Sequence, residues 1–531
     1  MSIFRYTASI DNTIVNAFQP NLKTRGTGAN CGQADVLEVY SIYGRAPAAT
    51  SSLTTGSQEL SRILIQFPVS NITADRAAGK IPGSGSVSFY LKLHNAETSK
   101  TVPRDFALEV APVSQQWQEG LGLDLENYSD LTKGNIGSNW IMATKDQTWT
   151  GSAGIVGGSY LTGSGNPRFK QTFDTGLEDL EIDISPLVEH WIAGTKANYG
   201  VGIFLSSSFE AYYSAPNPGA VEPLYTGSII NNTGGATTSY YTKRFFARST
   251  QYFFKKPAIE ARWDSVKRDD RGDFYYSSSL APGPDNLNTL YLYNYVRGRL
   301  RDIPAIGSTG SLMVSLYSGS IKNDSASLDK LILHNGATAL TGGWVSTGIY
   351  TCSVAVTGTT DITTLYDVWW SGSGEDPSTN VTEFFTGSIK TKVFGATTDT
   401  REPTYYMNIT NLQNRYSPEE TARFNLYIRN KYWNPTIYTK AKTTPEHIPV
   451  VSASYRVFRV LDALEAVPHN TGSDFATGLS YDVSGNYFDF NMKLLEPGYE
   501  YGFKFSFYDD ELKSWLEQDE MFKFRVVDYE Y

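Results

Sequence analysis

Carboxylates are the residues of this chain that come closest to a catalytic pattern. Asp124, Glu126 and Asp130 lie together in a tyrosine-containing segment, and paired carboxylates can cleave glycosidic bonds. Such close spacing is more typical of a solvent-exposed turn than of two groups on opposite sides of a cleft. Asp361, Glu375 and Asp376 are interpreted in the same way. The sequence therefore predicts a non-enzymatic protein without catalytic residues.

The histidines and loop motifs predict neither a metal site nor a cofactor site. The five histidines are His94, His190, His334, His447 and His469. None lies in a His-Glu-x-x-His motif or near a cysteine pair, so their spacing does not support a zinc site. The sequence contains neither a Gly-x-Ser-x-Gly elbow nor a phosphate-binding Gly-x4-Gly-Lys-Ser/Thr loop. We expect His190, which lies beside Glu189, on the surface of a short helix.

Two other features have simple structural interpretations. Cys31 and Cys352 are the only cysteines, and they are too few for a disulfide framework, so we expect free and largely buried thiols. The tripeptide Arg271-Gly272-Asp273 is flanked by charged residues and predicts an ordinary exposed loop.

Tryptophans are the most informative candidates for binding. Trp369 and Trp370 are adjacent in a strand-like run, and adjacent strand residues point to opposite faces. One ring should enter the core and the other should lie outside, as a subunit contact or as a platform that stacks on sugars. A subunit contact is the favoured reading. Trp433 and Trp515 are further interface candidates.

The composition indicates the class of protein that must position these residues. The 531 residues include 46 Gly, and aromatic residues make up 14% of the chain. Abundant aromatic residues and turn-forming glycines favour short strands, and the length exceeds what one core usually supports. We therefore predict an all-β chain of tandem β-sandwich modules.

The charge and the chain ends bear on partners and location. The net charge of -10 argues against nucleic-acid binding, which needs a basic surface. Neither a signal peptide nor a membrane-spanning run is recognisable, so we expect synthesis in a cytoplasm and no membrane contact.

Hydrophobic alternation predicts many strands and few helices. Clear strand patterns occur at 87–93, 289–293 and 503–507. Short helices are predicted at 186–192, 418–422 and 510–518. Changes in composition divide the chain into a module at 1–264 with long loop insertions, a linker at 265–288, a sandwich at 289–403 and a C-terminal sandwich at 404–531. The central module has the strand and turn pattern of an immunoglobulin-like domain.

Several motifs of the first module resemble the DNRLRE-type β-sandwich family, a jelly-roll-like domain. The matching stretches, in order, are Asp11–Val15, Gly26–Val39, Ser61–Phe67, Val87–Leu93, Trp117–Glu119, Trp149, Asp183–Gly194, Asn198–Ile203 and Lys256–Ala261. The resemblance covers about 260 residues, with Pro68 where the family usually has Asp. It implies a module for adhesion or surface display that sometimes binds polysaccharide. Trp117 and Trp191 are expected to be core residues, because their rings can bury a large area between sheets.

The whole chain is also similar to large structural proteins of T4-like marine and cyanobacterial tailed phages. The similar stretches lie at 4–32, 36–44, 245–272 and 479–505. The resemblance implies a structural virion protein, assembled in the bacterial host cytoplasm, whose partners are other virion proteins and copies of itself. Its location in the head, neck or tail stays open. The alternative is a displayed receptor- or glycan-binding adhesin module, with a host surface glycan as partner.

Overall fold

A computed structural model describes residues 2–20, 26–43, 58–123, 128, 137–149, 156–211, 213–215, 229–231, 235–236, 239–275, 282–318, 329–356, 362–372, 380–392, 404–433 and 447–528. Strands account for 46% of the described residues and helices for 7%, which confirms the predicted all-β fold with several sandwiches. The chain forms two compact units. The N-terminal unit contains Ser2–Asp264 and Gly472–Ala476, and the C-terminal unit contains Ser265–Thr471 and Thr477–Tyr531.

Two sheets form the core of the N-terminal unit. The four-stranded sheet has the order β1 (Ile3–Thr7), β15 (Ala258–Arg262), β5 (Ser88–Leu93), β10 (Leu180–Asp183). The seven-stranded sheet has the order β14 (Tyr241–Phe246), β3 (Val36–Tyr43), β4 (Gln58–Gln66), β11 (Val201–Leu205), β6 (Phe106–Pro112), β9 (Phe169–Phe173), with β2 (Ile10–Val15) paired to β4. Two short ribbons complete the strands of this unit, β7 (Met142–Thr144) with β8 (Gln147–Thr148) and β12 (Tyr213–Ala215) with β13 (Ile229–Asn231).

Strand alternation explains how this unit acquires two cores. In β5, Phe89, Leu91 and Leu93 are buried while the residues between them are only partly covered, as a period of two requires. In β4, Ile63 and Ile65 point into the core between the sheets, whereas Leu64 joins a second cluster. Both faces of the seven-stranded sheet are therefore covered by apolar side chains.

The second cluster contains three of the tryptophans, Trp117, Trp140 and Trp149, packed with Leu60 and Leu64. Trp117 is 1% exposed, and its indole N–H donates to the Tyr199 carbonyl at 2.9 Å. Trp191 is 6% exposed and belongs to the core between the sheets. Both side chains expected to be scaffold thus lie in the interior.

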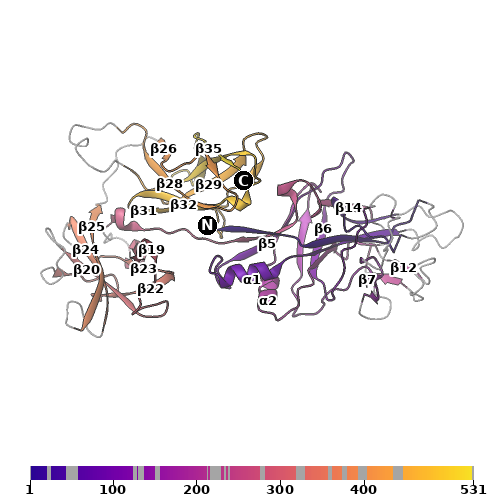
Figure 1. Cartoon of the computed structure of the whole chain (residues 1–531), viewed down its shortest axis with the longest axis horizontal. Helices are drawn as coiled ribbons and strands as arrows, with labels where there is room; N and C mark the ends of the chain where they lie inside the picture. The colour runs from indigo at the N-terminus through magenta and orange to yellow at the C-terminus, as the bar shows by residue number, and fades with distance from the viewer. Residues whose placement is uncertain are drawn as a thin grey trace. The chain divides into compact units, whose positions relative to one another are not determined.

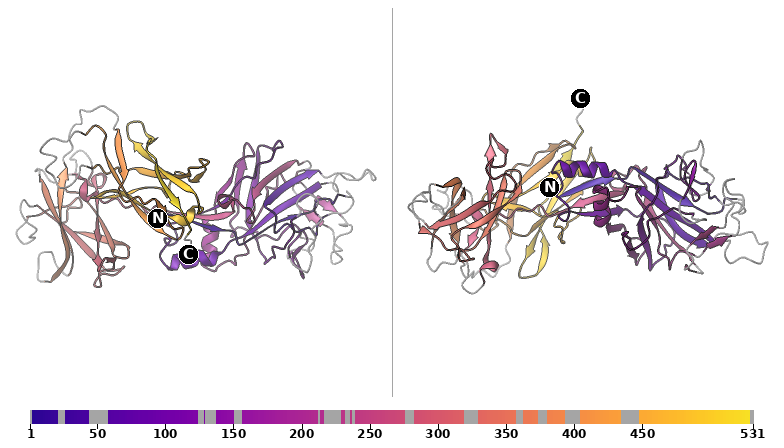
Figure 2. Two further views of the ribbon diagram at one scale, coloured as in Figure 1. Left: turned by 45° about the horizontal axis from the view of Figure 1, so that its top comes forward. Right: turned by 90° about the horizontal axis from the view of Figure 1, so that it is seen from below.

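Two helices lie side by side at one end of these sheets (Figures 1 and 2). They are α1 (Val69–Ala77) and α2 (Ser185–Ile192). The helix predicted at 186–192 corresponds to α2, whose Pro186 lies in the first turn, where a missing N–H is tolerated. Helix α1 was not predicted from the sequence. Its residues pack Val69 and Ile72 into the core, but the segment is polar on average and lacks a strong helical stripe.

The C-terminal unit contains two sandwiches. The first is a sheet of eight strands with the order β16 (Phe274–Tyr275), β25 (Val381–Lys392), β24 (Thr364–Gly372), β20 (Leu312–Ser318), β22 (Leu340–Ser346), β23 (Ile349–Val354), β17 (Asn288–Tyr293), with β21 (Asp329–Lys330) beside β20. Leu290, Val314, Tyr350 and Trp369 meet in one core, so the two ends of this sheet face each other. A short ribbon of β18 (Tyr295–Val296) and β19 (Arg299–Leu300) follows β17.

The second sandwich has an aromatic core. One sheet has the order β26 (Tyr405–Ile409), β28 (Thr421–Asn430), β32 (Gly485–Asn491), β31 (Ser480–Asp482). The other has the order β27 (Arg415–Tyr416), β35 (Phe522–Val526), β33 (Glu500–Asp509), β29 (Ala453–Arg459), β30 (Glu465–Val467), with β34 (Ser514–Glu517) beside β33. The rings of Phe424 and Phe503 meet across the sheets at 4.9 Å, and Tyr455 stacks on Phe488 at 4.6 Å.

The predictions of two helices in this unit are wrong. Residues 418–422 form a turn that leads into β28, and residues 510–518 form a turn followed by β34. In β34, Trp515 pairs with Tyr508 of β33, so tertiary pairing decides the conformation of this polar segment.

The segment 265–288, predicted to be a linker, contains residues that are packed within the C-terminal unit. The Asp269 N–H donates to the Tyr481 carbonyl at 3.1 Å, and the Tyr481 hydroxyl donates to Asp270 at 2.6 Å. Asp269 is 4% exposed and precedes a short 3-10 turn at Asp270–Gly272. This part of the segment thus connects the strands of the second sandwich to those of the first through β16 and β25.

Candidate interaction surface

The prediction that Trp369 or Trp370 is exposed is wrong. Trp369 is 0% and Trp370 2% exposed. They do point to opposite faces of β24, but both faces are covered. Trp369 lies in the core and donates its indole N–H to Asp367 at 2.7 Å. Trp370 lies in a second cluster with Tyr317, and its indole N–H donates to Ser315 at 3.0 Å.

Trp433 and Trp515, the other interface candidates, are half-buried. The guanidinium of Arg429 lies 5.8 Å from the centre of the Trp433 ring. The ring of Trp515 packs edge-on against Tyr508 at 5.5 Å. Each side chain thus keeps an accessible part, and their role as contact residues stays a prediction.

The most exposed tryptophan is Trp344, which was not among the predicted contact residues. All ten tryptophans are described; seven are buried, two are the half-buried residues above, and Trp344 is 43% exposed. Its indole N–H donates to Asp302 at 3.0 Å, and Asp302 also accepts from the Gly348 N–H at 2.6 Å. These bonds hold the ring in one orientation at the surface.

Further exposed apolar side chains come from the turns next to Trp344. Val345 follows it in β22, and Tyr295 and Val296 form β18; their exposed fractions are 38%, 58% and 50%. Hydrogen bonds join these turns, since the Asn294 N–H donates to the Gly348 carbonyl at 2.8 Å. We call Tyr295, Val296, Trp344 and Val345 the Trp344 surface.

The local sequence explains why this surface forms and how it could have been found. Gly348 has a φ of +73°, and a Cβ there would lie 2.6 Å from the Arg301 nitrogen, so glycine permits the tight turn after β22. Trp344 follows two glycines and precedes this turn. The feature of the sequence that could have identified Trp344 is a large aromatic residue placed between glycines near the end of a hairpin, because the end of a hairpin lies at the rim of a sheet.

The absence of a catalytic carboxylate pair stays a prediction. Asp124, Glu126, Asp130, Asp361, Glu375 and Asp376 lie outside the described residues.

Arg271, of the Arg-Gly-Asp tripeptide, is not an exposed loop residue. Its guanidinium forms a bidentate ion pair with the carboxylate of the fully buried Asp367, with nitrogen–oxygen distances of 2.5 and 2.6 Å. This side chain is therefore engaged inside the sandwich.

One histidine makes contacts that a nucleophile–base pair would require. His469 Nε2 lies 3.0 Å from the Ser506 hydroxyl, and Nδ1 lies 3.1 Å from the Ser454 hydroxyl. Ser506 and Ser454 are 5% and 0% exposed, so a substrate carbonyl could not approach either hydroxyl. Burial lowers the pKa of His469, and the ring connects β29 and β33 through its two hydroxyl contacts. His190, as expected, lies on a helix, where it contacts Thr195 at 2.8 Å.

Two arginines of the N-terminal unit are paired with carboxylates. Arg62 donates to both oxygens of Glu210 at 2.9 and 2.8 Å and to the Gly157 carbonyl at 2.8 Å. Asp11 is 1% exposed and accepts from the Arg248 N–H at 2.6 Å, while Glu119 binds the Arg248 guanidinium. Burial raises the pKa of Asp11 to about 7. Arg62 and Arg248 thus have carboxylate partners within the chain, as expected of residues of the scaffold.

The two cysteines lie in the interior of the described part of the chain. Neither Cys31 nor Cys352 forms a disulfide and both are buried, and burial raises the pKa of Cys352 to about 12. Among the described residues, no cluster of three or more histidine, cysteine or acidic side chains could hold a metal ion. Across those same residues, no helix has the length and apolar character needed to cross a bilayer.

Comparison with known proteins gives no assignment. No protein-family model matches the chain, and no curated protein sequence matches it.

Proposed function

We propose that this chain is a non-enzymatic structural protein of a tailed bacteriophage particle, acting through contacts with other virion proteins and with copies of itself. The sequence stretches that resemble phage structural proteins, at 4–32, 36–44, 245–272 and 479–505, support this proposal. The tandem β-sandwich architecture agrees with a part whose task is mechanical.

The observation that carries the proposal is the orientation of Trp344. An exposed tryptophan ring that is fixed by a hydrogen bond loses little conformational freedom when a partner covers it. Tryptophan is also among the residues that contribute most to the binding energy of protein interfaces. The Trp344 surface thus has the chemistry of a protein contact.

The second candidate function is a displayed adhesin that binds a host glycan. The same observation makes it worth testing, because an exposed indole ring can also stack on a sugar. The two functions differ in what surrounds Trp344 in a particle. A structural role covers the ring with protein, whereas an adhesin leaves it open to solvent.

Incorporation into particles tests the proposal. A phage that lacks its own copy of this gene would be complemented with the wild-type chain, with Trp344→Ala or with Leu461→Ala. Leu461 is 78% exposed and lies in the same unit, so it is a matched apolar control. We expect about ten-fold less Trp344→Ala chain in purified particles and no loss for Leu461→Ala. Equal incorporation of all three chains, or absence of the wild-type chain from particles, would overturn the proposal.

A further inference from the structure

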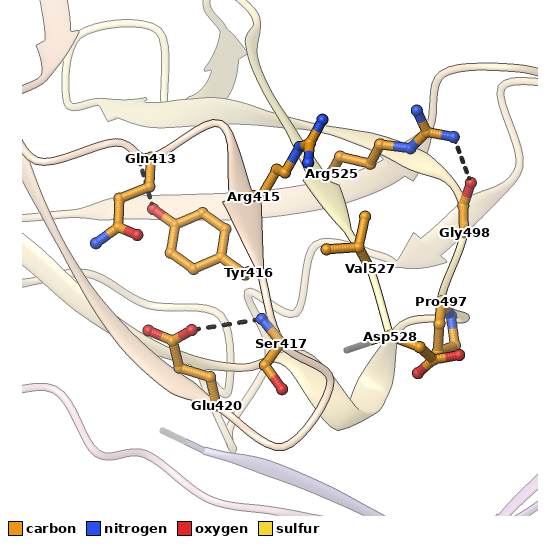
Figure 3. Close-up of a pocket in the computed structure, with 10 residues that line it drawn as sticks. All are labelled: Gln413, Arg415, Tyr416, Ser417, Glu420, Pro497, Gly498, Arg525, Val527 and Asp528. Carbon is orange, nitrogen blue, oxygen red and sulfur yellow. Dashed lines mark hydrogen bonds between the residues drawn. The ribbon is translucent and has the colours of Figure 1, made fainter. Parts of the chain in front are cut away.

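The C-terminal sandwich contains a polar pocket at the edge where β27 and β35 meet (Figure 3). Its volume of about 730 Å³ falls within the range of small-molecule sites. The lining residues are Gln413, Arg415, Tyr416, Ser417, Glu420, Pro497, Gly498, Arg525, Val527 and Asp528. Most of these side chains are polar or charged, so the pocket suits a hydrophilic ligand.

Two arginines form one side of this pocket. β27 and β35 run parallel, and Arg415 is directly opposite Arg525 in the register. Figure 3 shows both side chains leaving their strands on the same side of the pocket. Both are exposed, and neither forms an ion pair within the described part of the chain. Arg525 donates one hydrogen bond, to the Gly498 carbonyl at 3.1 Å.

This arrangement favours an anion. Like charges directly opposite each other on neighbouring strands are destabilising. A carboxylate between two guanidinium groups removes that repulsion and can accept several charge-assisted hydrogen bonds. The pocket thus offers a carboxylate two exposed guanidinium groups at one end, and neither is engaged in an ion pair within the described part of the chain.

The other side of the pocket has the opposite charge. Figure 3 places Glu420 and Asp528 across the pocket from the two guanidinium groups. Glu420 accepts only a long contact from the Ser417 N–H, at 3.5 Å, and no ion pair to Glu420 or Asp528 occurs among the described residues. Carboxylates are acceptors that neutral hydroxyl groups can satisfy. A ligand that is anionic throughout would be repelled at this side.

The floor between the two sides is fixed. Tyr416 is 3% exposed, and its hydroxyl accepts from the Gln413 N–H at 2.8 Å. Its ring packs on Phe424 and Phe524 of the aromatic core, at 5.4 and 5.7 Å. The strand that carries Arg415 is therefore anchored to the interior of the sandwich, which gives the site a preformed geometry.

We propose that this pocket binds a sugar acid. The carboxylate of the ligand lies between Arg415 and Arg525, and ring hydroxyls donate to Glu420 and Asp528. The proposal goes beyond a structural role in the particle and is independent of the Trp344 surface. Binding of such a ligand does not depend on whether the chain is assembled into a virion.

The test is a titration of the full-length chain by saturation-transfer NMR. The probes are D-glucuronate, D-galacturonate, neutral D-glucose and inorganic phosphate. We expect millimolar or tighter binding of at least one uronate, and at least ten-fold weaker binding of glucose and phosphate. Equal or tighter binding of phosphate would show a simple anion site and overturn the proposal, as would absence of uronate binding at 20 mM, on the order of ten times a millimolar Kd.

Variants locate the site. Arg415→Gln with Arg525→Gln should weaken uronate binding at least ten-fold, because each removed charge-assisted hydrogen bond contributes about that factor. Arg299→Gln, which removes an exposed arginine from β19, is the control and should leave binding unchanged. Glu420→Gln should weaken uronate binding but strengthen phosphate binding.

Thermal melts show whether each variant is folded. If the double variant is unfolded, the single variant Arg415→Gln gives the result, since the Arg415 side chain has no hydrogen bond or ion pair to lose in the described structure. Unchanged uronate affinity in a folded arginine variant would place the ligand elsewhere and contradict the proposal.

Discussion

Tryptophan rings in the interior of the N-terminal unit are the side chains whose loss should cost most. Trp117 and Trp191 occupy different clusters on opposite faces of the seven-stranded sheet. Replacing either by Ala should lower the free energy of unfolding by about 3–5 kcal/mol, because the transfer energy is lost and a cavity remains. Urea unfolding of each single variant measures this. A loss below about 1 kcal/mol would mean that the ring is not packed as the structure shows.

Asp11 predicts an unusual dependence of stability on pH. Its carboxyl is buried and has a pKa of about 7 in the folded chain, against 3.8 for the free group, so the folded state holds this proton more strongly. The contribution of Asp11 to stability should therefore fall as pH rises from about 4 to 7, by up to about 4 kcal/mol. Asp11→Asn keeps an acceptor for the Arg248 N–H and should remove that part of the slope.

The control for this measurement is Asp146→Asn, which replaces an exposed carboxyl in the turn between β7 and β8. Urea unfolding at several pH values should show the same slope for this variant as for the wild type. If Asp11→Asn also leaves the slope unchanged, then Asp11 is ionised in the folded chain at neutral pH and our account of it fails.

A substitution in β25 tests which contacts hold the segment at 265–275 in place. Gly387 in β25 lies against the ion pair of Arg271 and Asp367, and a Cβ there would approach their side-chain atoms to 2.5 and 2.8 Å. Gly387→Ala should displace the side chains of this buried pair and lower the free energy of unfolding by about 1–3 kcal/mol, the usual effect of adding a methyl group to a well-packed site.

Gly343→Ala is the matched control, because Gly343 also lies in a strand of this sandwich and a Cβ there meets nothing within 4 Å. Chemical unfolding of both variants makes the comparison. Equal stability of the two variants would mean that Arg271 does not depend on its pairing with Asp367, and that the segment before β16 is only loosely held.

The elements also show what could be predicted from the sequence. Strands with a clear period of two, such as β5, β17 and β33, lie where the alternation predicts them. The predicted helix at 510–518 became β34 because a neighbouring strand offered a pairing edge, which no local pattern reveals. The error at Trp369 and Trp370 has a similar cause. Alternation correctly places the two rings on opposite faces, but it does not say that both faces are covered.

The candidate sites are formed by residues that lie far apart in the sequence. Trp344 is fixed by Asp302, and the polar pocket forms because β27 and β35, more than a hundred residues apart, pair in parallel. Charge spacing along the sequence gives no sign that Arg415 and Arg525 meet. Only the topology brings these residues together.

At the scale of the whole molecule, sheet edges raise the question of what covers them. Among the described residues, strands at the rim of a sheet, such as β26 and β9, pair with a neighbouring strand on one side only, and such edges can pair with another chain. A structural virion protein would use some of these edges together with the Trp344 surface. An adhesin would attach by one end and leave its remaining surface free.

A reconstruction of the assembled particle tests the central proposal most directly, because it shows what the chain touches. We predict that each copy buries more than about 1,000 Å² against other virion subunits, more than incidental contacts usually bury. The contact should cover Trp344 and include residues of the C-terminal unit. If the C-terminal unit touches no other subunit, Trp344 faces solvent and only one end of the chain is attached, the structural role is contradicted and the adhesin function takes its place.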